Sequence, residues 1–211
     1  MRRVLIVDPH PIVRLGLRRI LQRSTDGFVI VEAESVASAL RCARADNFDL
    51  ILVDVDLPDR CALQLIAQLK RLRPACPVLV FSEMGEALCA PRCFRNGADG
   101  YLSKQSSPER ILAAVQRLLS GKTVLSAELA EQLVSRLNSR SRVGAPLHAQ
   151  LSDREFEIFH LLAHGRAESQ IARGLALSVK TVVANRKRIL HKLRVDNRVQ
   201  LMHYAASTGL I

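Results

Sequence analysis

The sequence lacks any long hydrophobic run. Its apolar stretches are short, as in Val4-Leu5-Ile6-Val7, and none approaches the roughly 20 residues needed to cross a bilayer. Met1-Arg2-Arg3 is followed by only four apolar residues before Asp8, whereas the centre of a signal peptide needs about 7–15. We therefore expect a cytoplasmic protein without a membrane span. With 48% hydrophobic and 24% charged residues, the composition also excludes a mostly disordered chain.

The cysteine pattern argues against a disulfide framework. The sequence has five cysteines, all within the first 93 residues, and no CxxC pair. An odd number without a secretory signal is not typical of disulfide-rich proteins. Cys89 and Cys93 are spaced to share one face of a helix and could form a redox pair, but small buried side chains are the favoured interpretation.

Acidic residues are scarce relative to basic ones. The chain has 31 Lys and Arg against 20 Asp and Glu, a formal net charge of +11. Residues 124–211 carry 13 basic and 7 acidic side chains, so this shorter part has the denser positive charge. Within it, residues 178–194 contain six basic side chains and no acid. Because a solvated face normally mixes signs, contact with a nucleic acid is favoured over a plain surface helix.

Short β-rich runs alternate with amphipathic segments over residues 1–123. The predicted strands are 3–7, 28–32, 49–54, 77–81 and 99–102, and the predicted helices are 11–23, 35–46, 62–72, 90–97 and 108–119. Continuously apolar strands separated by helices predict a five-stranded parallel sheet covered on both faces, as in a flavodoxin-like α/β domain. Ser107 and Pro108 are typical of a helix start. Pro91 indicates that the fourth helix begins near it or is short.

A second, smaller domain is predicted over residues 151–211. The preceding segment 124–150 reads as a linker with one helix over 126–138, because 139–146 has turn residues and no apolar period. Ser152 and Glu155 form a capping box, and Asp196 is a candidate N-cap. Helical spacing over 153–164, 168–175, 179–193 and 197–207 predicts a small all-α domain of four helices.

The helix predicted over 179–193 has two chemically different faces. Val182, Ile189 and Leu193 point one way, toward the domain core, at 100° per residue. A face of this kind fits the DNA major groove, where Lys and Arg reach guanine edges and phosphates. The candidate DNA-binding residues on the opposite side are Lys180, Thr181, Ala184, Lys187, Arg188 and Lys192.

Residues 151–205 resemble the LuxR-type helix-turn-helix of the NarL/FixJ family. The matching residues are Leu151, Arg154-Glu155, Leu161-Leu162-Ala163, Gly165, Ile171-Ala172, Leu175, Leu177-Ser178, Thr181-Val182, Ile189, Lys192-Leu193, Val195 and Asn197-Arg198. The resemblance implies that 179–193 is the recognition helix and that Val199, Met202 and Ala206 of the last helix help to form a dimer. Val183 and Asn185 depart from the family's usual Lys and His; Asn185 is kept as a hydrogen-bonding candidate.

Charged and polar side chains follow four of the predicted strands. Asp8 ends the first strand, Asp54 ends the third with Asp56 two residues on, and Ser82 and Lys104 follow the fourth and fifth. The carboxyl ends of parallel strands meet at one edge of a sheet, where ligands gather. Crowded carboxylates need a divalent cation such as Mg²⁺ or raised pKa values. One of them could then attack phosphorus, with the Ser82 hydroxyl and the Lys104 ammonium holding the phosphoryl oxygens.

This constellation resembles the receiver domain of two-component response regulators. The matching stretches are Val4-Leu5-Ile6-Val7-Asp8, His10-Pro11, Asp54, Leu57-Pro58, Ser82 and Gly97-Ala98-Asp99-Gly100-Tyr101-Leu102-Ser103-Lys104. The resemblance implies that Asp54 is the phospho-acceptor, that Ser82 and Lys104 contact the phosphoryl group, and that Tyr101 switches rotamer. It also implies Mg²⁺ as cofactor, with Asp8, Asp54 and Asp56 as candidate ligands.

Three residues depart from the receiver pattern. Pro9 replaces a second acid and has no ligating side chain, and Asp56 is the candidate that supplies the missing carboxylate. Glu83 replaces a small residue and would repel a phosphate, and Ala62 replaces a glycine. These departures keep open a second hypothesis, in which the protein acts without phosphorylation.

The sequence therefore predicts a non-enzymatic, two-domain response regulator that controls transcription. Its expected partners are double-stranded promoter DNA, a histidine kinase and RNA polymerase, and a homodimer is expected on DNA. The more distant hypothesis is a phosphatase that uses Asp54 and Asp56 as a DxD pair. That pair lies on the third predicted strand and no Thr follows it, and the C-terminal half would have no role.

Overall fold

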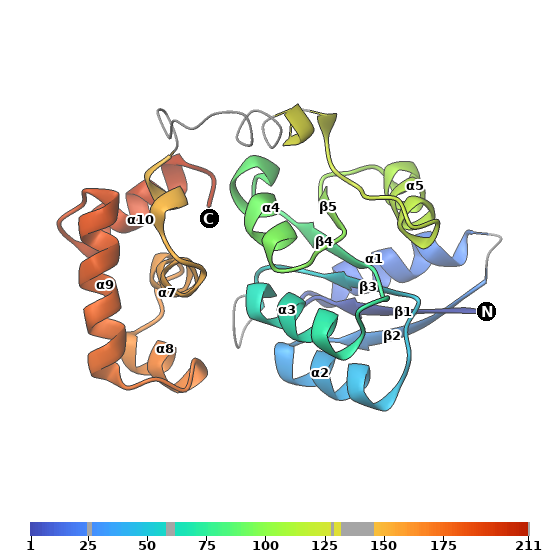
Figure 1. Cartoon of the computed structure of the whole chain (residues 1–211), viewed down its shortest axis with the longest axis horizontal. Helices are drawn as coiled ribbons and strands as arrows, with labels where there is room; N and C mark the ends of the chain where they lie inside the picture. Colours follow the sequence, from blue (N-terminus) through green and yellow to red (C-terminus); the bar gives the residue numbers. More distant parts are fainter. Residues whose placement is uncertain (25–26, 58–61, 128, 132–145, 211) are drawn as a thin grey trace. The chain divides into compact units, whose positions relative to one another are not determined.

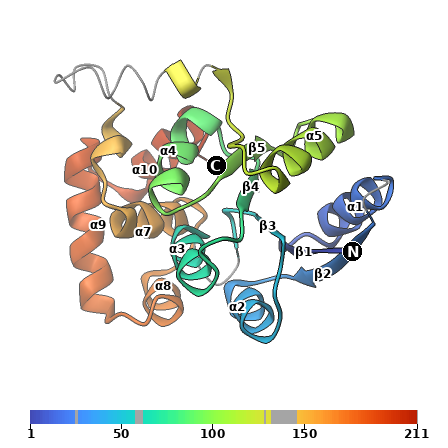
Figure 2. The same cartoon turned by 45° about the vertical axis from the view of Figure 1, so that its right-hand side comes forward.

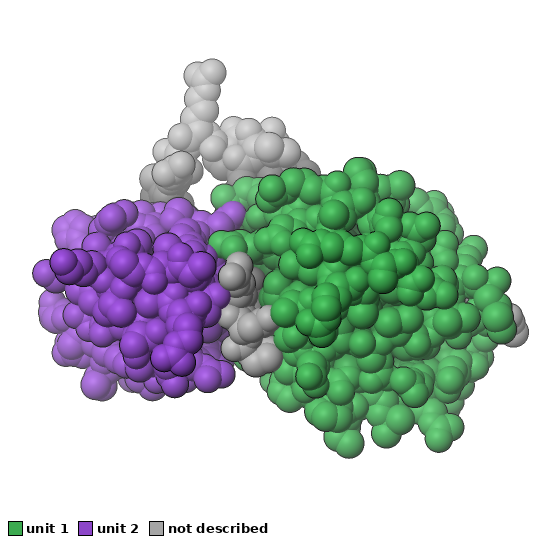
Figure 3. Space-filling model, turned by 90° about the horizontal axis from the view of Figure 1, so that it is seen from below, with its two compact units in different colours: residues 1–133 green, residues 134–211 purple. Residues whose placement is uncertain are grey.

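The computed structural model describes residues 1–211 except 25–26, 58–61, 128, 132–145 and 211. The chain divides into two compact units, Met1–Leu133 and Val134–Ile211, which Figure 3 distinguishes by colour. The boundary between them falls within the predicted linker of residues 124–150. No helix in the described ranges is long and apolar enough to span a membrane.

The first unit is built on a five-stranded parallel sheet with the order β2-β1-β3-β4-β5. The central strands are buried throughout, which is why their sequences are continuous apolar runs and not alternating ones. The flavodoxin-like prediction is thereby confirmed (Figure 1). The strands are β1 (Arg2–Val7), β2 (Phe28–Ala33), β3 (Leu50–Val53), β4 (Val78–Ser82) and β5 (Gly100–Ser103).

Helices cover both faces of this sheet. Helices α1 and α5 pack side by side on one face, where Leu17, Leu21 and Val115 meet Val4 and Ile6 of β1 in one buried cluster (Figures 1 and 2). The opposite face is covered by α2, α3 and α4. The helices are α1 (Pro11–Gln22), α2 (Val36–Ala45), α3 (Ala62–Leu72), α4 (Glu86–Arg95) and α5 (Pro108–Leu119).

Helix α4 corrects one sequence prediction. The start expected near Pro91 is wrong, because the helix begins at Glu86 and contains Pro91, although it is short at 10 residues. A proline inside a helix removes one backbone hydrogen bond and crowds the preceding turn. Here the turn before it is already closed by the Cys89 N–H, which donates to the Gly85 carbonyl at 3.2 Å. Cys89 and Cys93 are both fully buried on α4, with 3.6 Å between their Sγ atoms.

The chain that leaves α5 returns to the edge of the sheet. Val124 forms a bridge with Gly100, and the Tyr101 N–H donates to the Val124 carbonyl at 2.9 Å. The Ser126 N–H then donates to Glu86 Oε1 at 2.9 Å. Residues 127 and 129–131 are helical, in agreement with the start of the helix predicted over 126–138, and the rest of that prediction lies outside the described residues.

The second unit contains the four predicted helices and a preceding 3-10 turn. The capping box is confirmed, since the Ser152 hydroxyl accepts from the Glu155 N–H at 3.2 Å and Glu155 Oε2 accepts from the Ser152 N–H at 2.8 Å. The N-cap predicted at Asp196 is wrong, because Asn197 caps the last helix and accepts from the Gln200 N–H. The elements are η1 (Leu147–Gln150), α7 (Asp153–Ala163), α8 (Glu168–Gly174), α9 (Val179–Leu193) and α10 (Arg198–Ser207).

Candidate functional site

Two buried carboxylates lie together at the carboxyl edge of the sheet. Asp8 directly follows β1 and Asp54 directly follows β3, and the two strands are hydrogen-bonded neighbours. The Asp54 N–H donates to the Val7 carbonyl at 2.8 Å, which fixes the two strand ends side by side. Asp8 and Asp54 are only 2% and 3% exposed. The strand-end arrangement expected from the sequence is therefore present for this pair.

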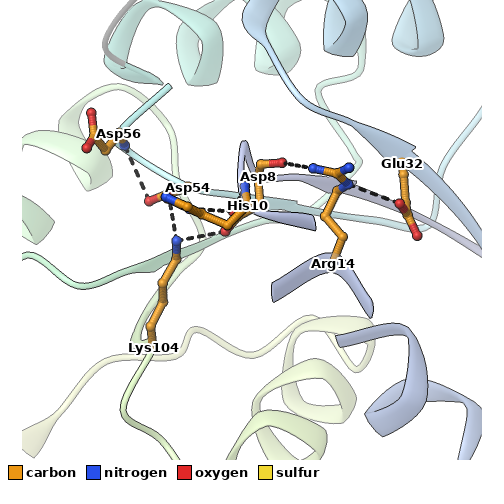
Figure 4. Close-up of polar contacts among 7 residues, drawn as sticks. All are labelled: Asp8, His10, Arg14, Glu32, Asp54, Asp56 and Lys104. Atoms are coloured by element: carbon orange, nitrogen blue, oxygen red, sulfur yellow. Dashed lines mark hydrogen bonds and ion pairs between the residues drawn. The ribbon is translucent and has the colours of Figure 1, made fainter. Parts of the chain in front are cut away.

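Lys104 joins the two carboxylates. Its Nζ lies 2.8 Å from Asp8 Oδ2 and 2.8 Å from Asp54 Oδ2 (Figure 4). The backbone places it there, because the Lys104 N–H continues the ladder to the Ser82 carbonyl at the end of β4. The pocket therefore holds two acidic groups and one basic group within hydrogen-bonding distance, shielded from water.

Burial controls the ionisation of this pocket. Loss of solvation raises the pKa of Asp54 to about 6, because it outweighs the hydrogen bond and charge of Lys104; the Asp8 charge raises it further. For Lys104, burial by itself lowers the pKa, but the hydrogen bonds and charges of Asp54 and Asp8 outweigh it and raise the pKa. At neutral pH the pocket thus holds an ionised Asp54 that is poorly solvated, which is the state a carboxylate nucleophile needs.

His10 belongs to the same pocket, although it was not among the predicted site residues. Its backbone N–H donates to Asp8 Oδ1 at 2.8 Å, and its ring Nδ1 lies 3.0 Å from the same oxygen. Asp8, His10 and Asp54 each offer a ligand atom within 4.8 Å of the others. The signal in the sequence was a histidine two residues after a strand-end acid, next to a helix-starting proline.

Asp56 does not join the cluster as expected. Its backbone N–H donates to Asp54 Oδ1 at 3.3 Å, while Figure 4 shows its carboxylate directed away from Asp8 and Lys104. The prediction that the Asp56 carboxylate compensates for Pro9 is therefore wrong. The physical reason is local. In the turn after β3 the backbone N–H of Asp56 points toward Asp54, and this backbone orientation directs the Asp56 side chain outward.

Arg14 fixes the Asp8 end of the pocket. Its guanidinium donates to the Asp8 backbone carbonyl at 2.7 Å and to Glu32 Oε2 at 3.0 Å (Figure 4). Arg18 pairs with the same Glu32 carboxylate. Ion pairs between α1 and β2 thus fix the end of β1 at Asp8. No local sequence pattern predicted these ion pairs.

Ser82 and Tyr101 both contact the segment that follows β4. The Ser82 hydroxyl accepts from the Met84 N–H at 3.3 Å, and the Tyr101 hydroxyl donates to the Met84 carbonyl at 2.6 Å. Both side chains are 1% exposed. Burial raises the pKa of Tyr101 far above its usual range, so the phenol stays a donor. Glu83, between Ser82 and Met84, is exposed.

The recognition-helix candidate α9 presents a basic surface. Lys180, Ala184, Lys187 and Arg188 are exposed, while Val182, Ile189 and Leu193 are buried, as the 100° spacing predicted. Within the described residues, no ion pair is found for Lys180, Lys187 or Arg188. Thr181 is half-buried next to the N-cap, and its Oγ1 lies 2.8 Å from Ser178 Oγ.

Two predicted DNA-contacting residues are placed differently from expectation. Asn185 is buried at 8% exposure and donates its side-chain amide to the Thr181 carbonyl at 2.8 Å, so it faces the domain and not a groove. Lys192 Nζ lies 2.6 Å from Glu155 Oε2 and is partly covered. Arg186 likewise pairs with Glu168. The acids that the basic stretch lacks are thus supplied by α7 and α8.

Helix α10 carries an exposed apolar stripe. Val199 is 76% and Met202 37% exposed, and Ala206 is exposed one turn further on. Spacings of three and four residues place them on one face of the helix. Leu201 and Ala205 are fully buried on the other side, so this stripe is not needed for the core of the unit.

Two family models match the chain, one over each unit. The model described as "Response regulator receiver domain" matches residues 4–116, and the model described as "Bacterial regulatory proteins, luxR family" matches residues 149–205. A Pseudomonas aeruginosa protein described as "Putative transcriptional regulator" is 37% identical over 213 aligned positions, and the alignment covers 100% of each chain. Transcriptional activator protein ExaE of Pseudomonas putida is 34% identical, with 99% of this chain and 97% of the relative covered.

A solved structure resembles the chain over both units. RcsB from Salmonella enterica serovar Typhimurium, bound to a promoter in the presence of the phosphomimetic BeF3⁻, is 25% identical with a TM-score of 0.76, and 98% of each chain is covered. The similarity to this protein and to the relatives extends over nearly all of the chain, so the matched region spans both units.

Proposed function

This chain belongs to the two-component response regulators that join a receiver domain to a LuxR-type DNA-binding domain, and from that premise we propose that phosphorylation of Asp54 controls its binding to promoter DNA. The single observation that carries the proposal is the buried Asp54 carboxylate held beside Asp8 by Lys104. Residues 1–123 would be the receiver and 151–211 the DNA-binding domain, joined by 124–150.

Asp54 is the nucleophile of the proposed reaction. One carboxylate oxygen attacks the phosphorus of a phosphohistidine or a small acyl phosphate, a P–O bond to Asp54 forms, and the bond to the donor breaks with its electron pair. Lys104, already 2.8 Å from Asp54, would move its ammonium to a phosphoryl oxygen. The Ser82 hydroxyl would donate to another, which changes its contact with Met84.

The donor set of the pocket fits a divalent cation. Asp8 and Asp54 already share one positive charge, the Lys104 ammonium, so the pocket is built to hold cationic charge. We assign Asp8 and Asp54 as the residues that would hold Mg²⁺, with the Asp56 carboxylate left out. The ion would neutralise charge that builds up on the phosphoryl oxygens.

The response would pass through Tyr101. Its hydroxyl bonds the Met84 carbonyl in the segment that Ser82 also holds, so a shift of Ser82 toward a phosphoryl oxygen disturbs the Tyr101 contact. Tyr101 and Gly100 in turn bind Val124, the start of the linker. A two-state change of this surface would alter how the DNA-binding domain is released or dimerises.

DNA contact is assigned to the exposed side of α9. Lys180, Lys187 and Arg188 supply charge to phosphates and guanine edges, and Ala184 allows close approach of the helix in the major groove. Thr181 lies at the helix start, where a hydroxyl reaches a phosphate. Asn185 and Lys192 are removed from this set, since the domain itself uses both.

The apolar stripe Val199, Met202 and Ala206 is proposed as the dimer contact on paired half-sites. A histidine kinase as phosphodonor and RNA polymerase as a downstream partner follow from the family. The DxD phosphatase hypothesis is not favoured, because both family models describe regulators and the second unit matches one of them.

The test combines phosphorylation with DNA binding. Full-length protein is treated with acetyl phosphate and Mg²⁺, separated on phosphate-affinity gels, and titrated against duplex DNA selected by the protein itself. The native chain should gain a retarded band and bind DNA at least severalfold more tightly, and Asp54→Ala should do neither. If native protein gains no phosphate but Pro9→Asp does, or if Asp54→Ala binds and regulates normally, the phosphorylation-independent hypothesis is correct.

A further inference from the structure

We propose that His10 is a metal ligand that acts with Asp8 and Asp54, and that this site prefers first-row transition ions such as Mn²⁺ to Mg²⁺. The proposal rests on the proposed function in one respect, namely that the Asp8–Asp54 pocket binds the cation. It goes further by naming the third ligand and the class of ion. The three residues offer ligand atoms that all lie within 4.8 Å of one another.

The Asp8 carboxylate has two differently occupied oxygens. Its Oδ2 lies 2.8 Å from Lys104 Nζ, while its Oδ1 lies 3.0 Å from His10 Nδ1 (Figure 4). Lys104 also forms an ion pair with Oδ2 of Asp54. Adjacent ligands bound about 2.1 Å from one ion and at right angles to each other are roughly 3 Å apart. The 3.0 Å between Asp8 Oδ1 and His10 Nδ1 is the length of a hydrogen bond, and it is also the spacing that two neighbouring ligands of one ion adopt.

The backbone holds His10 in place independently of any ion. Its N–H donates to Asp8 Oδ1 at 2.8 Å, and its carbonyl accepts from the N–H groups of Val13 and Arg14 as the N-cap of α1. Arg14 returns to the Asp8 carbonyl at 2.7 Å. With both ends fixed, the imidazole needs no rearrangement of the chain to face the Asp8 carboxylate.

Access and sequence agree with this role. Asp8 and Asp54 are almost fully buried, whereas the His10 side chain is 60% exposed, so an ion reaches the carboxylates past the imidazole. Pro9 has no ligating atom in its side chain. His10 is therefore the next residue after Asp8 whose side chain has a ligating atom, and that atom is a nitrogen.

A nitrogen donor influences which ion the site prefers. Mg²⁺ prefers oxygen ligands in a near-ideal octahedron and gives up water reluctantly. An imidazole nitrogen suits transition ions, whose affinity for a given site rises along the first row from Mn²⁺ to Cu²⁺. The competing interpretation is that His10 Nδ1 carries a hydrogen and donates it to Asp8 Oδ1, in which case no nitrogen reaches the metal.

Mn²⁺ binding to the full-length protein distinguishes the two interpretations. Free Mn²⁺ is counted by electron paramagnetic resonance during a titration, Mg²⁺ is added as competitor, and bound Mn²⁺ is examined by pulsed resonance for coupling to a ¹⁴N nucleus. His10→Ala is compared with His203→Ala, which removes an exposed histidine on α10, and with Asp54→Asn, which removes a carboxylate of the site.

The native chain and His203→Ala should show ¹⁴N coupling and should need a large excess of Mg²⁺ to release Mn²⁺. His10→Ala should lose the coupling and about tenfold or more of its Mn²⁺ affinity, and Asp54→Asn should lose the site. The proposal is overturned if the native protein binds no Mn²⁺, if its bound Mn²⁺ shows no ¹⁴N coupling, or if His10→Ala binds within twofold of native. Phosphorylation of native protein with Mg²⁺, measured in parallel, tests the proposed function separately.

Discussion

Replacement of Asp54 by asparagine should stabilise the receiver domain at neutral pH. Asparagine keeps the shape of the side chain but removes the buried negative charge. The pKa of Asp54 is raised from 3.8 to about 6, chiefly by burial. A shift of about two units corresponds to roughly 3 kcal/mol of the free energy of unfolding, since each unit is worth about 1.4 kcal/mol. The ionised form of Asp54 thus destabilises the folded protein even with Lys104 beside it.

The sign of the pH dependence follows from the raised pKa. The folded protein retains the Asp54 proton over a range where the unfolded chain has lost it, so this stabilising contribution is complete below about pH 4 and is lost as the pH rises through about 6. Asp54→Asn should therefore match native protein near pH 4 and exceed it by up to roughly 3 kcal/mol above about pH 7.

Scanning calorimetry of the full-length protein at several pH values would measure this. The unfolding transition of the receiver domain is identified as the one whose midpoint temperature changes in Asp54→Asn. Asp46→Asn is the matched control, because Asp46 is exposed and pairs with Arg3 at the surface, where such pairs contribute about 0–1 kcal/mol. The reasoning is refuted if Asp54→Asn is less stable than native protein at neutral pH, or if its advantage does not shrink on acidification.

Three further predictions concern function. Phosphorylation of Asp54 by acetyl phosphate should be slower near pH 5.5 than near pH 7.5, because only the ionised carboxylate attacks phosphorus and burial raises its pKa; a flat rate profile contradicts this. Lys187→Ala and Arg188→Ala should each weaken DNA binding and reduce the slope of log affinity against log salt by about 0.9, with exposed Lys122→Ala in the receiver as a neutral control. Val199→Glu puts a charge in the apolar stripe of α10, so it should abolish cooperative binding to paired half-sites and spare a single half-site, as read from gel shifts on both DNAs; loss of both would contradict the dimer assignment.

Much of the fold could be predicted from local patterns. Buried parallel strands give continuous apolar runs, and helix caps such as Ser107 and Ser152 mark boundaries through bonds that span three residues. The bounds of α3, α5 and α9 agree with the sequence prediction for this reason. Pro91 misled the prediction of α4, because packing of the helix on the sheet offset the cost of one missing hydrogen bond.

The site was predictable only as far as its strand ends. A parallel sheet brings residues that follow its strands to one edge, so Asp8 and Asp54 could be paired from the sequence. Which further side chain joins Asp8 and Asp54 depends on where that side chain points. The His10 ring points toward Asp8, whereas the Asp56 carboxylate points away from it.

The sequence by itself determined the two domain types, the acids at the strand ends and the basic side of α9, because these depend on periodicity and on neighbours within one turn. Only the tertiary structure decided that Lys192 is neutralised by Glu155, 37 residues earlier in the chain. The physical reason is that electrostatic partners are selected by distance in space, and a charge that looks free along the chain can be neutralised by an acid from another helix.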